Sequence, residues 1–153
     1  MKQGGTIANE TGNILESFVN NILKDKGYEF IPKNKFQAAI ALRQKIYTRH
    51  LIICETIYGT NWNVDFIVNN PDGKIITLII ECKWQQSKGS VDEKYPYLVH
   101  NIKEKSPYPA IIIIDGNGYK AGAKKWLERQ IDKKLLGVFL MGEFTRWINL
   151  NGF

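Results

Sequence analysis

The first apolar pattern in the chain has the period of a helix. Apolar residues between Ile14 and Leu23 recur at intervals of one, four and five positions, which places them on one side of an α-helix. Thr11 can cap the start of this helix and Gly27 can end it, because both residue types favour those positions. We therefore expect a helix over residues 11–26.

After residues 34–47, which carry a weaker helical pattern, the period changes to two. Runs rich in Ile, Val, Thr and Tyr predict strands over residues 50–58, 64–69 and 75–84. Turn-forming residues fill positions 69–73 between the last two runs, so these two strands are expected to form a hairpin.

The second half of the chain alternates between helix and strand patterns. We expect a helix from near Pro96, a buried strand over 110–114, a helix over 119–133 and a last strand over 138–141. Strand, helix and strand after a hairpin predict an α/β fold, with a central mixed β-sheet flanked by helices on both faces. A chain of 153 residues is the size of one domain, so we expect residues 1–153 to form a single domain.

The charge of the chain is unevenly distributed. The 21 Lys and Arg residues exceed the 15 Asp and Glu residues, which gives a net charge of +6. Residues 1–50 hold 8 basic and 4 acidic residues, residues 51–100 hold 4 and 6, and residues 101–134 hold 8 and 4. Basic flanks around an acidic centre suit a metal-dependent enzyme acting on a polyanion, although a charged run is about as often a solvated surface.

Several classes of protein are excluded or disfavoured. The sequence has no membrane-length apolar run and no signal-peptide pattern at its start, so we expect a cytoplasmic protein that does not enter a membrane. Its two cysteines, Cys54 and Cys82, lie in apolar strand-like runs, which excludes a disulfide scaffold and disfavours a cysteine metal site. His50 and His100 are isolated in the sequence and are expected to be packed or hydrogen-bonded side chains.

The most informative charged residues end the predicted strand over 75–84. Alternation places Glu81 and Lys83 on one face of that strand. With a hairpin turn centred on Asp72, Asp65 lies diagonal to Glu81 on the same face, whereas a register slip of one residue would turn it away. Charges at the end of an apolar strand are costly unless they are paired or bind metal, and two carboxylates on adjacent strands suit Mg²⁺. An isolated motif of this kind is usually a surface salt bridge, but its place after a hairpin favours a metal site.

These residues resemble the core of the PD-(D/E)XK nuclease superfamily, whose best-known members are type II restriction endonucleases. Asp65 is followed, after fifteen residues, by Glu81-Cys82-Lys83, and Gln85 matches the (D/E)xKxQ variant of the motif. Glu16 matches the helical glutamate that many members add to the metal site. The resemblance extends over about residues 11–147, with one departure, since valine and not proline precedes Asp65.

The resemblance implies a restriction endonuclease-like core and a Mg²⁺-dependent DNA endonuclease that hydrolyses phosphodiester bonds. By this resemblance, Asp65 and Glu81 would ligate Mg²⁺, for which Mn²⁺ could substitute, and the carbonyl of Cys82 would be a third donor. Lys83 would position the attacking water and Gln85 would support the site. Glu16 would hold a metal-bound water or a second ion, or else be a carboxylate on the helix surface.

The predicted DNA contacts come from the basic segment before the motif and from the segment after it. They are Arg43, Lys45, Arg49, Lys88, Lys94 and Tyr95. In this segment, contacts with phosphates and stacking on bases or sugars would come from Lys94, Tyr95 and Tyr97. The alternative, in which one tyrosine packs in the core and the lysine is solvated, is at least as common for such residues.

Cleavage of both strands of double-stranded DNA needs two active sites or two events, so we expect a homodimer with twofold symmetry. Two other functions remain open at this point. One is a Holliday-junction-resolvase-like or structure-selective nuclease with the same chemistry, and the other is a DNA-binding module that keeps the fold without cleaving.

Overall fold

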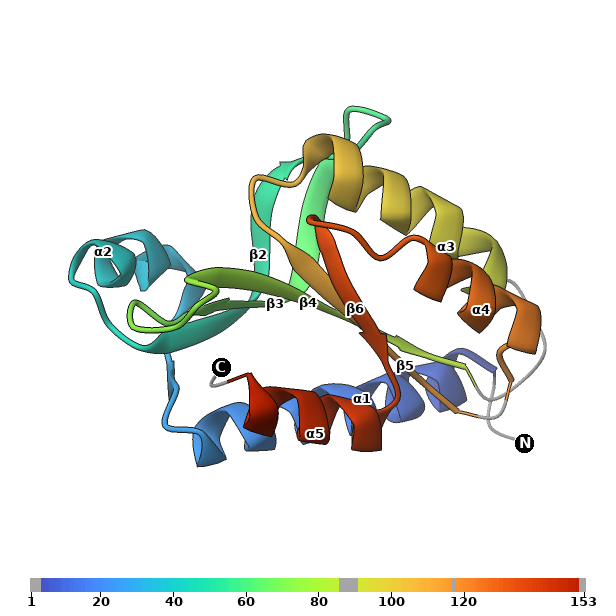
Figure 1. The fold of residues 1–153 in the computed structure, drawn as a ribbon, viewed down its shortest axis with the longest axis horizontal. Helices are drawn as coiled ribbons and strands as arrows, with labels where there is room; N and C mark the ends of the chain where they lie inside the picture. Colours follow the sequence, from blue (N-terminus) through green and yellow to red (C-terminus); the bar gives the residue numbers. More distant parts are fainter. Residues whose placement is uncertain (1–3, 86–90, 117, 152–153) are drawn as a thin grey trace.

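A computed structural model of the protein describes residues 4–85, 91–116 and 118–151, and its centre is a mixed sheet with strand order β1-β2-β3-β4-β5-β6 (Figure 1). The strands are β1 (Glu29–Phe30), β2 (Ile46–Glu55), β3 (Asn61–Asn69), β4 (Thr77–Trp84), β5 (Ala110–Asp115) and β6 (Leu135–Phe139). Strands β2, β3 and β4 are antiparallel neighbours, whereas β4, β5 and β6 are parallel, and β1 runs parallel to β2. This arrangement confirms the predicted mixed sheet.

Helices cover both faces of the sheet, as predicted. They are α1 (Gly4–Asp25), α2 (Phe36–Ala41), which follows the 3₁₀ turn η1 (Lys33–Lys35), α3 (Val91–His100), which continues into the π-helical turn η2 (Asn101–Lys105), α4 (Ala121–Arg129) and α5 (Met141–Leu150). Helices α1 and α5 lie side by side on one face, and α3 and α4 cover the other (Figure 1). No helix among the described residues is long and apolar enough to cross a membrane.

Each face of the sheet has its own apolar core. Leu15 and Val19 of α1 pack with Phe144 of α5 on one face, which we call the α1 core. Tyr95 of α3 and Leu127 of α4 belong to the core on the opposite face, which we call the α3 core. All five of these side chains are buried, so the two cores hold the sheet between them.

Part-way along β2 and β3, the alternation of side chains between the two faces of the sheet is interrupted. In β3, Val64 packs in the α3 core and Phe66 packs in the α1 core, although residues two apart in a strand normally share a face. The paired strand β2 changes at the same level, where His50 has a left-handed backbone with φ of +53°. Asp65 lies between the two halves of β3, so the change of face occurs at a predicted catalytic residue.

The lengths of several elements differ from the prediction. The second helix ends at Ala41, and Ile46, which was included in that helix, begins β2. Helix α3 begins at Val91, so Pro96 lies inside it and not at its start. Helix α5 was not predicted. The C-terminal glycine of α1 was predicted correctly, since Gly27 has φ of +84°, the left-handed conformation that ends many helices.

Candidate active site

Asp65 and Glu81 meet where the pairing of β3 with β4 ends. The last pair in this ladder is Phe66 with Ile80, so the next position along each strand places Asp65 opposite Glu81. The predicted register, with Asp65 diagonal to Glu81, was wrong by two residues because the turn between the strands is centred one residue later. An even shift keeps every side chain on its face, so both carboxylates still point to the same side of the sheet.

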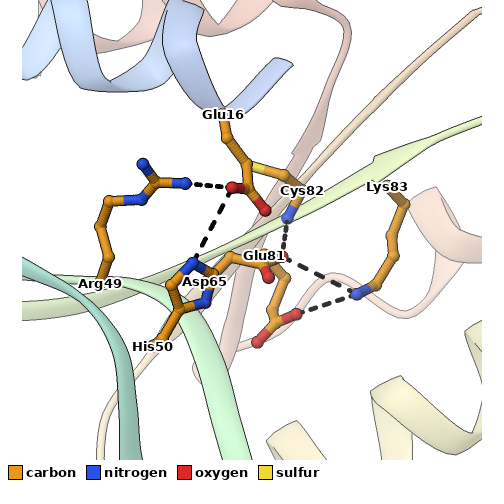
Figure 2. Close-up of polar contacts among 7 residues, drawn as sticks. All are labelled: Glu16, Arg49, His50, Asp65, Glu81, Cys82 and Lys83. Carbon is orange, nitrogen blue, oxygen red and sulfur yellow. Dashed lines mark hydrogen bonds and ion pairs between the residues drawn. The ribbon is translucent and has the colours of Figure 1, made fainter. Parts of the chain in front are cut away.

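Short polar contacts join the three charged residues of the motif (Figure 2). The backbone N–H of Cys82 donates a hydrogen bond of 2.7 Å to Oδ2 of Asp65. The ammonium nitrogen of Lys83 lies 3.1 Å from Oε2 of Glu81 and 3.8 Å from Oδ2 of Asp65. The lysine therefore lies within ion-pair distance of both carboxylates, and the strand-end backbone fixes the orientation of Asp65.

The carboxylate of Glu81 is unusually deprived of solvent. Glu81 is only 2% exposed, and its Oε1 has no hydrogen-bond partner among the described residues. Burial raises the pKa of Glu81 to about 7, against the opposing effect of Lys83. Burial alone would lower the pKa of Lys83, but the charges of Glu81 and Asp65 outweigh it and raise that pKa above its usual range. A buried acceptor without a partner, next to a second carboxylate, is an arrangement that a bound cation would stabilise.

A cavity of about 660 Å³ opens beside these three residues. It runs between the end of β4, the hairpin formed by β2 and β3, and helix α3, and Asp65, Glu81 and Lys83 all line it. The charged groups of the motif thus face a space that a substrate could enter.

Comparison with known families agrees with this geometry. The PD-(D/E)XK nuclease superfamily domain matches residues 7–151 of the sequence. The chain belongs to the PD-(D/E)XK nuclease superfamily. No curated protein and no solved structure gave a significant match. The resemblance seen in the sequence is confirmed, and the superfamily supports nuclease activity for this chain.

Gln85 follows the nuclease motif at the end of β4 and is buried. Its backbone N–H donates to the carbonyl of Asp115 at 2.9 Å, and its own carbonyl accepts from Gly118 at 2.8 Å. Gly116 has φ of +98°, and a Cβ on it would lie 2.1 Å from the carbonyl oxygen of Gln85. The end of β5 therefore comes so close to the residue after β4 that position 116 requires glycine. This close approach also determines where Gln85 lies.

Glu16 belongs to a separate group of charged residues in the nuclease. Its Oε2 forms an ion pair with Nη2 of Arg49 and lies 4.0 Å from Nε2 of His50 (Figure 2). Among the residues that the structure describes, no three His, Cys, Asp or Glu side chains come close enough together to hold one metal ion. Glu16 is therefore outside the carboxylate pair of Asp65 and Glu81. The proximity of His50 to Glu16 was not anticipated, because nothing in the sequence links the two residues.

The residues of the predicted basic segment differ in their surroundings. Arg49 is engaged by Glu16 and also lies over the ring of Phe66, 5.0 Å from its centroid. Lys45 donates to the carbonyl of Lys26 at 2.6 Å, and Arg43 is exposed at the end of α2. The segment therefore does not present all of its charges to one partner.

The predicted DNA contacts after the motif also differ from one another in their exposure. Tyr95 is 1% exposed and packs in the α3 core, so it is not accessible to DNA, and the prediction that it contacts DNA is corrected. Lys94 is exposed and Tyr97 is half-buried, and both line the cavity. Lys88 lies outside the described residues. Helical phase explains the difference, because Tyr95 shares the buried side of α3 with Leu98.

Further residues of the cavity were missed by sequence reasoning. They are Thr56, Thr60, Asn61, Trp62, Asn63, Trp84, Leu98 and Asn101. They come from the hairpin, from β4 and from α3 with η2, so no local spacing in the sequence connects them. The alternation of Asn61, Asn63 and Asp65 along β3 was the one available signal.

Proposed function

We propose that this chain is a Mg²⁺-dependent DNA endonuclease that hydrolyses phosphodiester bonds, a type II restriction endonuclease or a close relative. The observation that carries the proposal is the buried Oε1 of Glu81, which has no hydrogen-bond partner in the part of the chain that the structure describes and lies beside Asp65 and Lys83 at an open cavity. A structural salt bridge has no need of a second carboxylate oxygen that is buried without a partner, since such a group destabilises the fold.

The donor set fits Mg²⁺. Carboxylate oxygens of Asp65 and Glu81 would hold the ion, and the carbonyl of Cys82 would complete the protein ligands. The N–H of Cys82 points toward β3 to reach Asp65, and in an extended strand the carbonyl of the same residue points to the same neighbour. When bound, Mg²⁺ would polarise the phosphodiester and make an attacking water more acidic.

The protein groups supply positioning and charge. Lys83, within ion-pair distance of both carboxylates, would orient the attacking water and stabilise negative charge that develops on the phosphate. Gln85 would support the strand end that carries Lys83. Glu16, oriented by Arg49, would hold a further water or a second ion at the edge of the site.

We propose double-stranded DNA as the substrate and a homodimer as the form that cuts both strands. Lys94 on the cavity rim and Arg43 near α2 are exposed cations that suit contacts with phosphates. Binding should weaken steeply as salt rises, because each phosphate contact releases counterions. Sedimentation of the protein alone and with DNA tests the dimer.

The decisive experiment is incubation of purified protein with plasmid and end-labelled DNA, in Mg²⁺ or in EDTA, followed by mapping of the cuts. We expect cleavage in Mg²⁺ only, and we expect Lys83→Ala to abolish it. Lys124→Ala is the matched control, since Lys124 also pairs with two carboxylates, Glu128 at 2.9 Å and Glu143 at 3.4 Å, away from the cavity.

The pattern of cuts distinguishes the alternatives. Cleavage at one fixed sequence supports a restriction enzyme, and cleavage at branch points supports a resolvase. Mg²⁺-dependent cleavage that survives in Lys83→Ala would disprove the catalytic assignment. DNA binding without cleavage in Mg²⁺ or Mn²⁺ would identify a binding module.

A further inference from the structure

The cavity is larger than a metal ion and a phosphate group require. Its volume of about 660 Å³ lies within the range of about 300–1,000 Å³ in which proteins bind small organic ligands. Trp62 and Leu98, each 6% exposed, form part of its floor. The exposed residues Asn61, Asn63 and Lys94 lie at its rim. It is therefore a concave site with an apolar floor, adjoining the catalytic carboxylates.

The lining does not have the chemistry of a surface for the DNA backbone. Besides Lys83, the described residues that line the cavity include one cation, Lys94, and the others outside the motif are amides, hydroxyls, aromatic rings and a leucine. Backbone recognition relies on several Lys and Arg residues. Aromatic and apolar surfaces next to amide groups instead suit a nucleobase, which has a flat face and a hydrogen-bonding edge.

An exposed aromatic ring lies next to this cavity. Tyr58, at the tip of the hairpin, stacks on the cavity residue Tyr97 with 5.0 Å between ring centroids and 19° between planes. Tyr58 is 77% exposed, so much of its ring surface is available to another partner. Exposed aromatic rings are the usual stacking surfaces for unpaired bases.

The hairpin tip that carries Tyr58 is anchored to helix α3 and η2. Asn101, which is 2% exposed, accepts a hydrogen bond of 2.9 Å from the backbone N–H of Ile57. Within the tip, the hydroxyl groups of Thr56 and Thr60 lie 2.7 Å apart. The two walls of the cavity are thus connected, and Tyr58 is presented from a well-bonded turn.

We infer that the cavity binds one nucleoside of the cleaved strand, turned out of the base stack beside the phosphate that is cut. This inference rests on the proposed nuclease chemistry and, within it, favours a structure-selective relative over an enzyme that cuts one fully paired sequence. A base within a paired duplex exposes only its edges in the grooves, so it reaches the floor of the cavity only after leaving the stack. Unstacking costs least at a mismatched or unpaired nucleotide. The substrate class is therefore duplex DNA with an unpaired or mismatched nucleotide next to the cut.

A binding experiment tests the inference without requiring cleavage. The Lys83→Ala protein is titrated in EDTA with fluorescently labelled duplexes that are identical except for one mismatched pair, in two unrelated sequences. We expect the mismatched duplexes to bind about tenfold or more tightly than the paired ones. 5-Iodouracil at the mismatched position should photo-crosslink to the segment that carries Tyr58 and Trp62.

Variants of the exposed ring test the site itself. In the Lys83→Ala background, Tyr58→Ala should lose most of the preference for the mismatched duplex, and Tyr58→Phe should retain it because the ring remains. Phe30→Ala is the control, since Phe30 is an exposed aromatic residue of β1, paired with the opposite end of β2 from the hairpin tip. Asn63→Leu, with Asn21→Leu on α1 as its control, tests the hydrogen-bonding rim in the same way.

The outcomes separate this inference from the proposed function. Equal binding of paired and mismatched duplexes, or crosslinks only outside the cavity segments, overturns the inference even when the wild-type protein cleaves DNA in Mg²⁺. A mismatch preference that depends on Tyr58, together with no cleavage by the wild-type protein, overturns the nuclease proposal and supports the nucleoside site. Absence of DNA binding in this assay, together with no cleavage by the wild-type protein in Mg²⁺, overturns both.

Discussion

Replacement of Glu81 by glutamine should stabilise the metal-free protein while abolishing its activity. In the folded chain the pKa of Glu81 is raised from 4.5 to about 7, chiefly by burial. At about 1.4 kcal/mol for each pKa unit, ionised Glu81 destabilises the fold by about 3 kcal/mol at pH 8. The amide keeps the shape and can still accept from Lys83, but it carries no charge to desolvate. We therefore predict that Glu81→Gln raises the free energy of unfolding in EDTA by about 3 kcal/mol, or roughly 6–12 °C in Tm for a domain of this size.

The pH dependence of this effect follows from the direction of the pKa change. Between pH 4.5 and about 7 the folded chain retains a proton on Glu81 that the unfolded chain has lost, so the contribution of Glu81 to stability falls as pH rises through that window. The advantage of the variant should thus shrink to about 1 kcal/mol or less at pH 5. Thermal unfolding in EDTA at pH 5 and pH 8 measures it. Glu29→Gln, on the exposed strand β1, is the control and should change little. A Glu81→Gln protein less stable than wild type at pH 8 would refute the reasoning.

Three further predictions follow from the site and the core. Mg²⁺ should raise the Tm of the wild-type protein more at pH 8 than at pH 6, because a proton competes with the ion for Glu81. At a hundredfold excess of Mg²⁺ over its Kd, the free energy of unfolding should rise by about 2.7 kcal/mol. A change in Tm that does not depend on pH would contradict this prediction. Gly116→Ala should lower the free energy of unfolding by more than about 1 kcal/mol, and it should also reduce DNA cleavage, because a Cβ at this position displaces Gln85. Denaturation and plasmid assays measure the two effects. Gly142→Ala is the control and should change little in either assay, because a Cβ there meets no atom. Phe144→Ala should reduce the free energy of unfolding by about 3–5 kcal/mol, and a value below 1 kcal/mol in a urea titration would show that α5 does not complete the α1 core.

Much of the fold could be predicted because the patterns that determine it are local. The hairpin turn and the apolar run of β5 are each readable within about ten residues, and together they imply the mixed sheet. The elements that were missed depend on context. Ile46 follows the polar residues Arg43, Gln44 and Lys45, so its local pattern fits the end of a helix or the start of a strand, and its pairing with β3 decides the outcome. Phe144 and Ile148, one helical turn apart, are the buried positions of α5, and two such positions near the chain end are a weak signal.

The start of α3 shows how a correct rule can be applied at the wrong place. Proline favours the first helical turn, which suggested a start near Pro96. The acidic residues Asp92 and Glu93 lie in the first turn of the observed helix, where their charge is favourable. With the helix starting at Val91, the phase of its buried side was readable from the sequence, and Tyr95 would have been assigned to the core.

The candidate site also has a part that the sequence predicts, the charged motif, and a part that it does not, the cavity. Asp65, Glu81 and Lys83 come from one hairpin, so the alternation of strands was sufficient to bring them to one face, even with the register in error by two residues. The cavity beside them depends on how α3 docks against the hairpin tip, as through the bond from Ile57 to Asn101. Contacts of this kind join residues about 44 positions apart, and no pattern in a single sequence specifies them.

The interruption of side-chain alternation at His50 and Asp65 divides the hairpin of β2 and β3 into two parts with different surroundings. On one side of it, β2 and β3 belong to the sheet that fixes the carboxylates, and on the other side, residues 51–64 extend against α3 and form a wall of the cavity. The pairing of Phe66 with Ile80 lies outside this outer part, so we expect substitutions there to leave it in place. We therefore expect that changes in the outer hairpin can reshape this wall of the cavity while Asp65 and Glu81 stay opposite each other.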